Sequence, residues 1–185
     1  MTEKNTKGAM EMSVGTIVTI VLLMSVLVLG IFFIQKIFKS SNGALDLTDQ
    51  QLQDQLQALY SNGQDNLAVL PQSRTLDISP GDVDAFGVGV KNTERGGDSI
   101  SFGYKVEASG DDNKKNCGRT NEILNTYIRQ GSSEEGIVLS PGSTASRKVR
   151  IEIPQGAPLC LVRYKITVLK EGTPLNSDYF DINIK

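Results

Sequence analysis

The sequence contains no histidine and no tryptophan, and only two of its 185 residues are cysteine. Without histidine the chain lacks the commonest general base and the commonest metal ligand in proteins. It also has no nucleophile elbow, no phosphate-binding loop and no Cys-x-x-Cys pair. A catalytic Ser–Lys pair is left as an alternative, because its two residues can be neighbours in the fold without being neighbours in the sequence. We therefore expect no enzyme, no catalytic residue, no metal and no cofactor.

The net charge is only −2, which indicates neither nucleic acid nor a strongly charged substrate as partner. One basic strand face, Arg147, Lys148 and Arg150, lacks the interleaved aromatic side chains that stack on bases. Carboxylate pairs such as Asp82 and Asp84 do not match a calcium loop, which needs six or more converging oxygens. We expect all of these charged groups to be solvated.

Residues 14–34 carry no ionisable side chain. As a helix this run spans about 32 Å, close to the thickness of a bilayer core. A secretory signal has a shorter apolar core, of about 7–15 residues, and then a small-residue cleavage site. Here "QKIFKSSNGA" follows, with no A-x-A pattern and no lipid-accepting cysteine. Residues 9–39 are therefore predicted to be a retained transmembrane helix, with the lipid bilayer as partner.

The flanking charges barely decide the orientation of this helix. Lys4 and Lys7 lie before it, and Lys36 and Lys39 lie at its end. The positive-inside rule therefore favours neither orientation of the helix clearly. The β-rich remainder and the two cysteines favour a cytoplasmic N-terminus and an extracellular C-terminal domain.

The start of the chain carries a resemblance. Lys7-Gly8-Ala9, then a polar residue and a long apolar helix, resembles the N-terminus of archaeal type IV pilin-like proteins and archaellins. The stretch 15–18, "GTIV", is similar to the start of archaellin helices. The resemblance implies that a membrane peptidase cuts after Gly8 and removes residues 1–8 as a leader. It also implies self-assembly, since in that family the retained helix packs into a filament core or waits in the membrane.

The sequence allows two roles for Glu11. If the chain begins at Ala9, its carboxylate docks on the amine of a neighbouring subunit; otherwise it is an interfacial glutamate near a helix N-terminus. Two features differ from the pilin pattern. Glu11 would be the third residue after the cut, whereas pilins usually carry glutamate fifth, and "KSSNG" (39–43) is predicted to interrupt the helix.

Residues 40–65 are predicted to be a linker and a short amphipathic helix. Thr48 and Gln51 fit a capping box, and Gly63 is a natural stop. The apolar face of this helix consists of Leu52, Leu56, Leu59 and Tyr60. We expect it to cover an open end of the next domain.

Residues 66–185 alternate with period two, which is typical of strands with one buried face and favours antiparallel sheets. The predicted core of these strands is Phe86, Val88, Phe102, Tyr104, Val149, Ile151, Val162, Ile166, Phe180 and Ile182. "DISPGDVDAFGVGV" and "VLSPGSTASRKVRIEI" repeat one strand–turn–strand pattern. About seven short strands with such turns predict an antiparallel two-sheet β-sandwich of immunoglobulin-like type.

The segment 108–136 gives the weakest signal. "SGDDNKKNCGRTNE" and "GSSEEG" are typical of loops, and "ILNTYIRQ" suits a strand or a short helix. Cys117 lies in the first of these loops and Cys160 on the inward row of a strand. In an exported domain we expect them to form one disulfide; the alternative is two unrelated thiols.

The sequence thus predicts a non-enzymatic, membrane-anchored surface protein, either a pilin-like or archaellin-like structural or adhesive subunit or a solitary immunoglobulin-like binding domain that does not polymerise. Its surface ligand is unknown.

Overall fold

The computed structural model describes residues 7–40, 48–61 and 66–185, and the side chains of residues 15–34, 48–60 and 66–185. The chain forms two compact units, Met1–Ser41 and Asn42–Lys185. The elements in chain order are α1 (Lys7–Ser40), α2 (Asp49–Ser61), β1 (Leu67–Leu70), β2 (Thr75–Ile78), β3 (Val83–Lys91), β4 (Ile100–Ala108), α3 (Asp111–Cys117), α4 (Asn121–Asn125), β5 (Ile128–Gln130), β6 (Ser133–Leu139), β7 (Thr144–Glu152), β8 (Cys160–Lys170) and β9 (Thr173–Ile184).

Helix α1 forms the first unit and contains an apolar run of 20 residues, Gly15–Ile34, none of it buried. The hydroxyls of Thr19 and Ser25 donate to the carbonyl oxygens of Gly15 and Val21, one turn back, at 2.7 and 2.8 Å. These two hydroxyls are therefore satisfied within the helix, as a lipid environment requires. By length and composition the run suits a membrane span, and equally a signal sequence.

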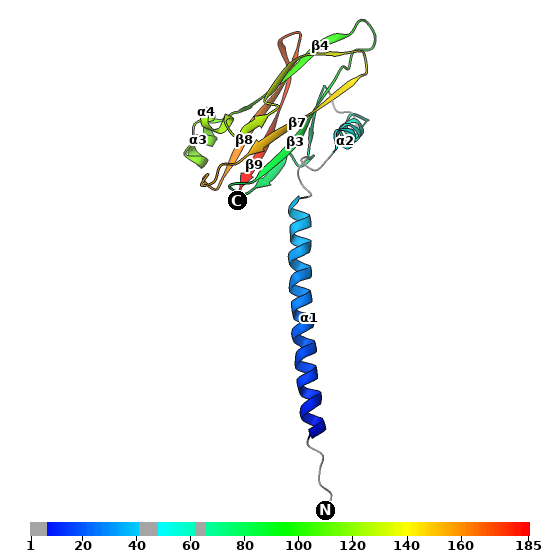
Figure 1. Cartoon of the computed structure of the whole chain (residues 1–185). Coiled ribbons are helices and arrows are strands. Elements are labelled where there is room, and N and C mark those ends of the chain that lie inside the picture. Colours follow the sequence, from blue (N-terminus) through cyan, green and yellow to red (C-terminus); the bar gives the residue numbers. More distant parts are fainter. Residues whose placement is uncertain (1–6, 41–47, 62–65) are drawn as a thin grey trace, which may run out of the picture. The chain divides into compact units, whose positions relative to one another are not determined.

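The second unit is mostly β, with two sheets (Figure 1). The first sheet has the strand order β1-β3-β7-β5, and the second has the order β2-β9-β8-β4-β6. Neighbouring strands are antiparallel, except that β2 runs parallel to β9. The expectation of purely antiparallel sheets is therefore wrong at this edge. Residues alternate between the two faces in both kinds of strand, so the pattern held no signal for the direction of β2.

One apolar core lies between the two sheets. All ten side chains that the alternation predicts for it, from Phe86 to Ile182, are at most 2% exposed, which confirms this prediction. Phe86 of β3 and Phe180 of β9 stack across the two sheets, with ring centroids 4.3 Å apart.

The two Ser-Pro-Gly turns are equivalent corners of the domain. Each leads from an edge strand of the second sheet to an inner strand of the first, β2 to β3 and β6 to β7. Gly81 and Gly142 have φ angles of 92° and 77°, as the residue after proline in a type II turn requires. Their N–H groups donate to the carbonyls of Ile153 and Asn92, at 2.8 and 2.9 Å. These acceptors directly follow β7 and β3. The turn between β2 and β3 therefore caps the end of β7, and the turn between β6 and β7 caps the end of β3.

Helix α2 begins with the predicted capping box. The Gln51 N–H donates to Thr48 Oγ1 (3.2 Å), and the Thr48 N–H donates to Gln51 Oε1 (3.0 Å). The helix packs on the outer face of the first sheet, and not over an open end of the domain. It lies on one side of the domain, and α3 and α4 lie on the other (Figure 1).

Two glycines of β3 make room for α2. The buried side chains of this contact are Leu52, Leu56, Leu59 and Tyr60 of α2 and Ala68 and Leu70 of β1. A Cβ atom at Gly87 would lie 2.4 Å from Leu52 Cδ1, and one at Gly89 would lie 2.7 Å from Tyr60 Oη. We call Gly87 and Gly89 the glycine seat. The alternation that turns the larger residues of β3 inward leaves this seat on its outer face.

The segment 108–136 is more regular than its sequence predicts. "SGDDNKKNCGRTNE" forms α3 and the start of α4, and β6 begins inside "GSSEEG". "ILNTYIRQ" is divided, with α4 ending at Asn125 and β5 beginning at Ile128. These short elements are held by tertiary contacts with β8, β4 and β7, which outweigh the loop-like local composition.

Candidate functional site

The predicted processing residues Lys7, Gly8 and Ala9 begin helix α1, and Glu11 follows them in the same helix. Their backbone is helical. Their side chains lie outside the described ones, as do residues 1–6, the linker residues 41–47 and Gly63. Cleavage after Gly8 and docking through Glu11 stay predictions. Helix α1 ends at Ser40, within the stretch predicted to interrupt it.

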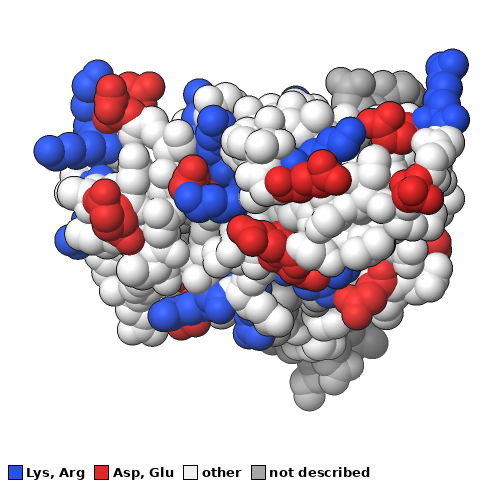
Figure 2. Space-filling view, turned by 90° about the horizontal axis from the view of Figure 1, so that it is seen from above, with Lys and Arg blue, Asp and Glu red and all other residues white. Residues whose placement is uncertain are grey.

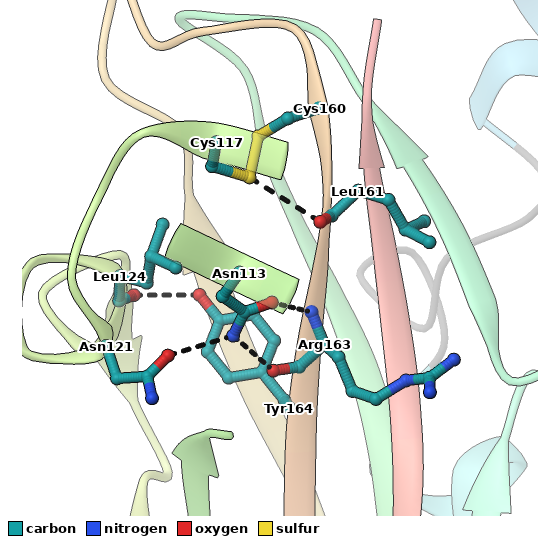
Figure 3. Close-up of a disulfide and its surroundings, with 8 residues drawn as sticks. All are labelled: Asn113, Cys117, Asn121, Leu124, Cys160, Leu161, Arg163 and Tyr164. Carbon is teal, nitrogen blue, oxygen red and sulfur yellow. Dashed lines mark hydrogen bonds between the residues drawn. A yellow bond between two sulfur atoms is a disulfide. The ribbon is translucent and has the colours of Figure 1, made fainter. Parts of the chain in front are cut away.

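Cys117 and Cys160 form the predicted disulfide (Figure 3), with Cα atoms 5.2 Å apart and a sequence separation of 43. The alternative of two unrelated thiols does not hold. Cys117 is buried at the end of α3 and not in a polar loop, and Cys160 begins β8. The bond ties the insert, residues 109–127 between β4 and β5, to an inner strand of the second sheet. Cys117 Sγ also lies 3.5 Å from the Leu161 carbonyl oxygen.

Asn113 of α3 takes the place of a strand beside β8 (Figure 3). The β4 ladder ends where Ala108 faces Tyr164, so the start of β8 has no strand partner on that side. The buried amide of Asn113 supplies one: its Oδ1 accepts from the Arg163 N–H (2.8 Å), and its Nδ2 donates to the Arg163 carbonyl (3.0 Å). Nδ2 also donates to Asn121 Oδ1, which links α3 to α4. Asn113 is therefore a structural group whose hydrogen bonds are satisfied.

Two further hydrogen bonds fix the insert. The buried Tyr164 hydroxyl donates to the Leu124 carbonyl at 2.7 Å, and the Ala108 N–H donates to Asn125 Oδ1 at 2.6 Å. Burial raises the pKa of Tyr164, so its hydroxyl stays protonated as a donor. Sequence reasoning missed Asn113 and Asn125, because an asparagine in a polar segment carries no mark of a buried, long-range contact.

A second polar cluster joins the two sheets where β6 and β7 approach each other. The guanidinium of Arg147 binds both carboxylate oxygens of Glu134, with Nη2 2.6 Å from Oε1. This hydrogen bonding lowers the pKa of Glu134. Buried Tyr104 lies beside the pair, and desolvation, followed by the charge of Glu134, raises its pKa to about 12. With both carboxylate oxygens bound to the guanidinium, the pair forms a charge-assisted link between the two sheets.

The position of Arg147 corrects the predicted basic face. Successive strand residues point to opposite sides of a sheet, so Arg147 shares the row of Val149, while Lys148 and Arg150 lie on the other face. On the end of the domain shown in Figure 2, the described Lys and Arg side chains are interleaved with Asp and Glu. Within that view, a polyanion would find no continuous basic surface.

A hollow of about 530 Å³ lies beside α3 and α4. It is lined by Gly110, Asp111, Lys114, Lys115, Thr120, Asn121 and Glu122. A hydrogen bond with Thr120 lowers the pKa of Glu122, and the lining contains both acidic and basic side chains. Among the described residues, no group of three His, Cys, Asp or Glu is placed to hold a metal ion.

No protein-family model and no curated protein matches the chain. Among solved structures, the CARDB domain of a Pyrococcus furiosus protein in complex with di-metal ions is similar over 64% of this chain and 87% of that one, with 18% identity and a TM-score of 0.34. An alkylpurine DNA glycosylase from Pseudomonas fluorescens bound to DNA is similar over 63% of this chain, with 15% identity and a TM-score of 0.30. A family 123 glycoside hydrolase from Clostridium perfringens is similar over 60%, with 13% identity and a TM-score of 0.34. The chain spans only 29% and 23% of the length of these two enzymes, respectively. At these scores the likenesses carry no argument about function.

Proposed function

We propose that this chain is a non-enzymatic, single-pass membrane protein that displays an immunoglobulin-like β-sandwich outside the cell. Its role is that of a structural or adhesive subunit similar to pilins or archaellins. The N-terminus is cytoplasmic and the C-terminal domain extracellular. The observation that carries the proposal is an unburied apolar helix of 20 residues that precedes a disulfide-bonded, mostly β domain.

Two physical arguments support this topology. Disulfides persist in oxidising compartments and are rare in the cytosol, so the Cys117–Cys160 bond favours export of the domain. The 20-residue apolar run is longer than the core of a typical secretory signal, about 7–15 residues, which favours a retained anchor. Two facing sheets with one common core support the sandwich.

The runner-up function is a solitary binding domain that does not polymerise. One observation favours it: the described helix α1 ends at Ser40, whereas pilin-like helices often run on into the head. Cleavage after Gly8 separates the two functions, because it would remove Lys4 and Lys7 from the edge of the helix. A trimmed helix whose only charges at its start are Glu11 and the new amine would leave the bilayer for a filament at a lower free-energy cost than a helix that carries two lysines there.

The deciding measurement is the intact mass of the mature chain isolated from native membranes. A chain that begins at Ala9 supports the pilin-like function, and one that begins at residue 1 or 2 supports the solitary domain. Replacing Gly8 with leucine should block trimming and assembly but leave membrane attachment intact. Gly15→Leu is a matched control within the same helix, where an added Cβ has nothing within 4 Å, and it should be trimmed normally.

The topology is tested with a membrane-impermeant amine reagent on intact cells. Lys114 and Lys115 are exposed on α3, so both should be modified without permeabilisation. Modification only after permeabilisation would refute an extracellular domain.

A further inference from the structure

Helix α2 is held by a contact surface of its own. Its four buried side chains pack with Ala68 and Leu70 of β1 in a cluster separate from the main core. No described side chain of α2 belongs to that core. Removing α2 would therefore expose its own cluster and leave the packing between the two sheets in place.

The direction of α2 follows from its contacts with β3. Leu52 lies over Gly87, and Tyr60 lies over Gly89, with the Lys91 ammonium 5.4 Å from the centre of its ring. The helix therefore runs along β3 toward the end of the domain that holds Lys91.

The C-terminus lies at the opposite end. The Lys185 N–H donates to the carbonyl of Ile78, the last residue of β2, shortly before β3 begins at Val83. The chain thus enters α2 nearer the C-terminal end of the domain and is led back along the first sheet before it enters β1.

We propose that α2 is a releasable strap. Tension between the membrane helix and the β domain peels α2 from the glycine seat, while the two sheets stay folded. The tension enters at the start of α2, so its contacts break one after another. The peeling stops at β1, because Leu67 and Val69 are anchored in the main core and β1 is paired with β3 over its whole length. The strap rests on the proposed function in one respect only, which is that an anchor supplies the tension.

Release of the strap has a defined length. Residues 48–66 are 19 residues, which extend to about 65 Å at about 3.3–3.6 Å per residue. The folded 13-residue helix spans about 20 Å at about 1.5 Å per residue. The same 13 residues extend to about 45 Å, so unwinding the helix alone gains about 25 Å. This gain would lengthen the tether and let the domain turn, so that a surface contact survives movement of the membrane.

The experiment is optical-tweezers stretching of the full chain in detergent. Handles are attached at residue 42 and at the C-terminus by chemistry that spares cysteine, so that the disulfide stays closed and α1 bears no force. We expect a reversible first step of about 65 Å in contour length, followed by a larger step at higher force. The second step releases residues 67–185 less the 42 residues locked between Cys117 and Cys160, or about 270 Å.

Three variants test whether the two steps are independent. Leu56→Ala should lower the force of the first step only, and Ile166→Ala in the main core should lower the second only. Val138→Ala, at a site 66% exposed on β6, is the control and should change neither. A single step that releases the whole length overturns the strap, as does a Leu56→Ala variant that lowers both forces. A chain found to be untrimmed or differently oriented would refute the proposed function and leave these steps unchanged.

Discussion

Reduction of the Cys117–Cys160 disulfide should lower the free energy of unfolding of the β domain by about 4 kcal/mol. The bond closes a loop across 43 residues of sequence, and the chain-entropy model assigns about 4 kcal/mol to a loop of that length. This free energy is an upper bound, because a compact unfolded chain has less conformational entropy to lose when the disulfide forms. The insert should stay in place after reduction, since Asn113 and Tyr164 hold it by hydrogen bonds that do not involve sulfur.

The assay is urea unfolding of the full chain in mild detergent, with and without a phosphine reductant. The chain has no tryptophan, so tyrosine emission reports on unfolding through the buried Tyr104, Tyr127 and Tyr164. With a urea slope of about 2 kcal/mol/M, the loss would move the midpoint down by about 2 M.

The control is the double variant Cys117→Ala/Cys160→Ala. It should unfold at the midpoint of the reduced wild type and should not respond to reductant. If reduction left the wild-type midpoint in place, the bond would not be constraining the unfolded chain. A double variant that responded as the wild type does would show that the reductant acts elsewhere.

Three further predictions concern stability, and the first and third are measured by the same urea titration. Ile166→Ala, at a fully buried site in β8, should cost about 2–5 kcal/mol, and a cost below 1 kcal/mol would contradict the packed core. Gly89→Val should weaken the packing of α2 by about 1–3 kcal/mol through overpacking against Tyr60; this lowers the force of the first step under tension, and an unchanged force would show that α2 is not seated there. The pKa of Glu134 is lowered by Arg147 in the folded state, so the stabilisation is present above its unfolded pKa of about 4.3 and is lost as the pH falls through the lower folded value. Wild type should therefore lose more stability than Glu134→Gln between pH 7 and pH 3, by less than about 1 kcal/mol because both side chains are more than one third exposed; an equal loss in both proteins would refute this role of the pair.

Periodicity predicted the core because it depends only on local geometry. Phe86, Val149 and Ile166 were assigned to the buried row by alternation, and all three are fully buried. The capping box of Thr48 and Gln51 was equally readable, since both partners lie within one helical turn. The same rule, applied to Arg147, would have placed it on the row of Val149 and away from Lys148.

The insert was not predictable in this way. Asn113 lies in a stretch with the composition of a loop, and its hydrogen-bonding partner is the backbone of Arg163, 50 residues away. Nothing in the local sequence marks that distant partner. The parallel direction of β2 was hidden for a similar reason, because strand direction in a sheet is set by the partner and not by the side-chain pattern.

By itself the sequence determined the features whose causes are local: the apolar helix, the alternating strands with their buried rows, the Ser-Pro-Gly corners and the capped start of α2. The tertiary structure alone decided which strands are neighbours, that α2 rests on the glycine seat, and that α3 completes the edge of β8. Local features follow from dihedral preferences and from the spacing of apolar side chains along one segment. Pairing and docking follow from the shape and unsatisfied hydrogen bonds of segments far apart in the chain, which meet only when the core has formed.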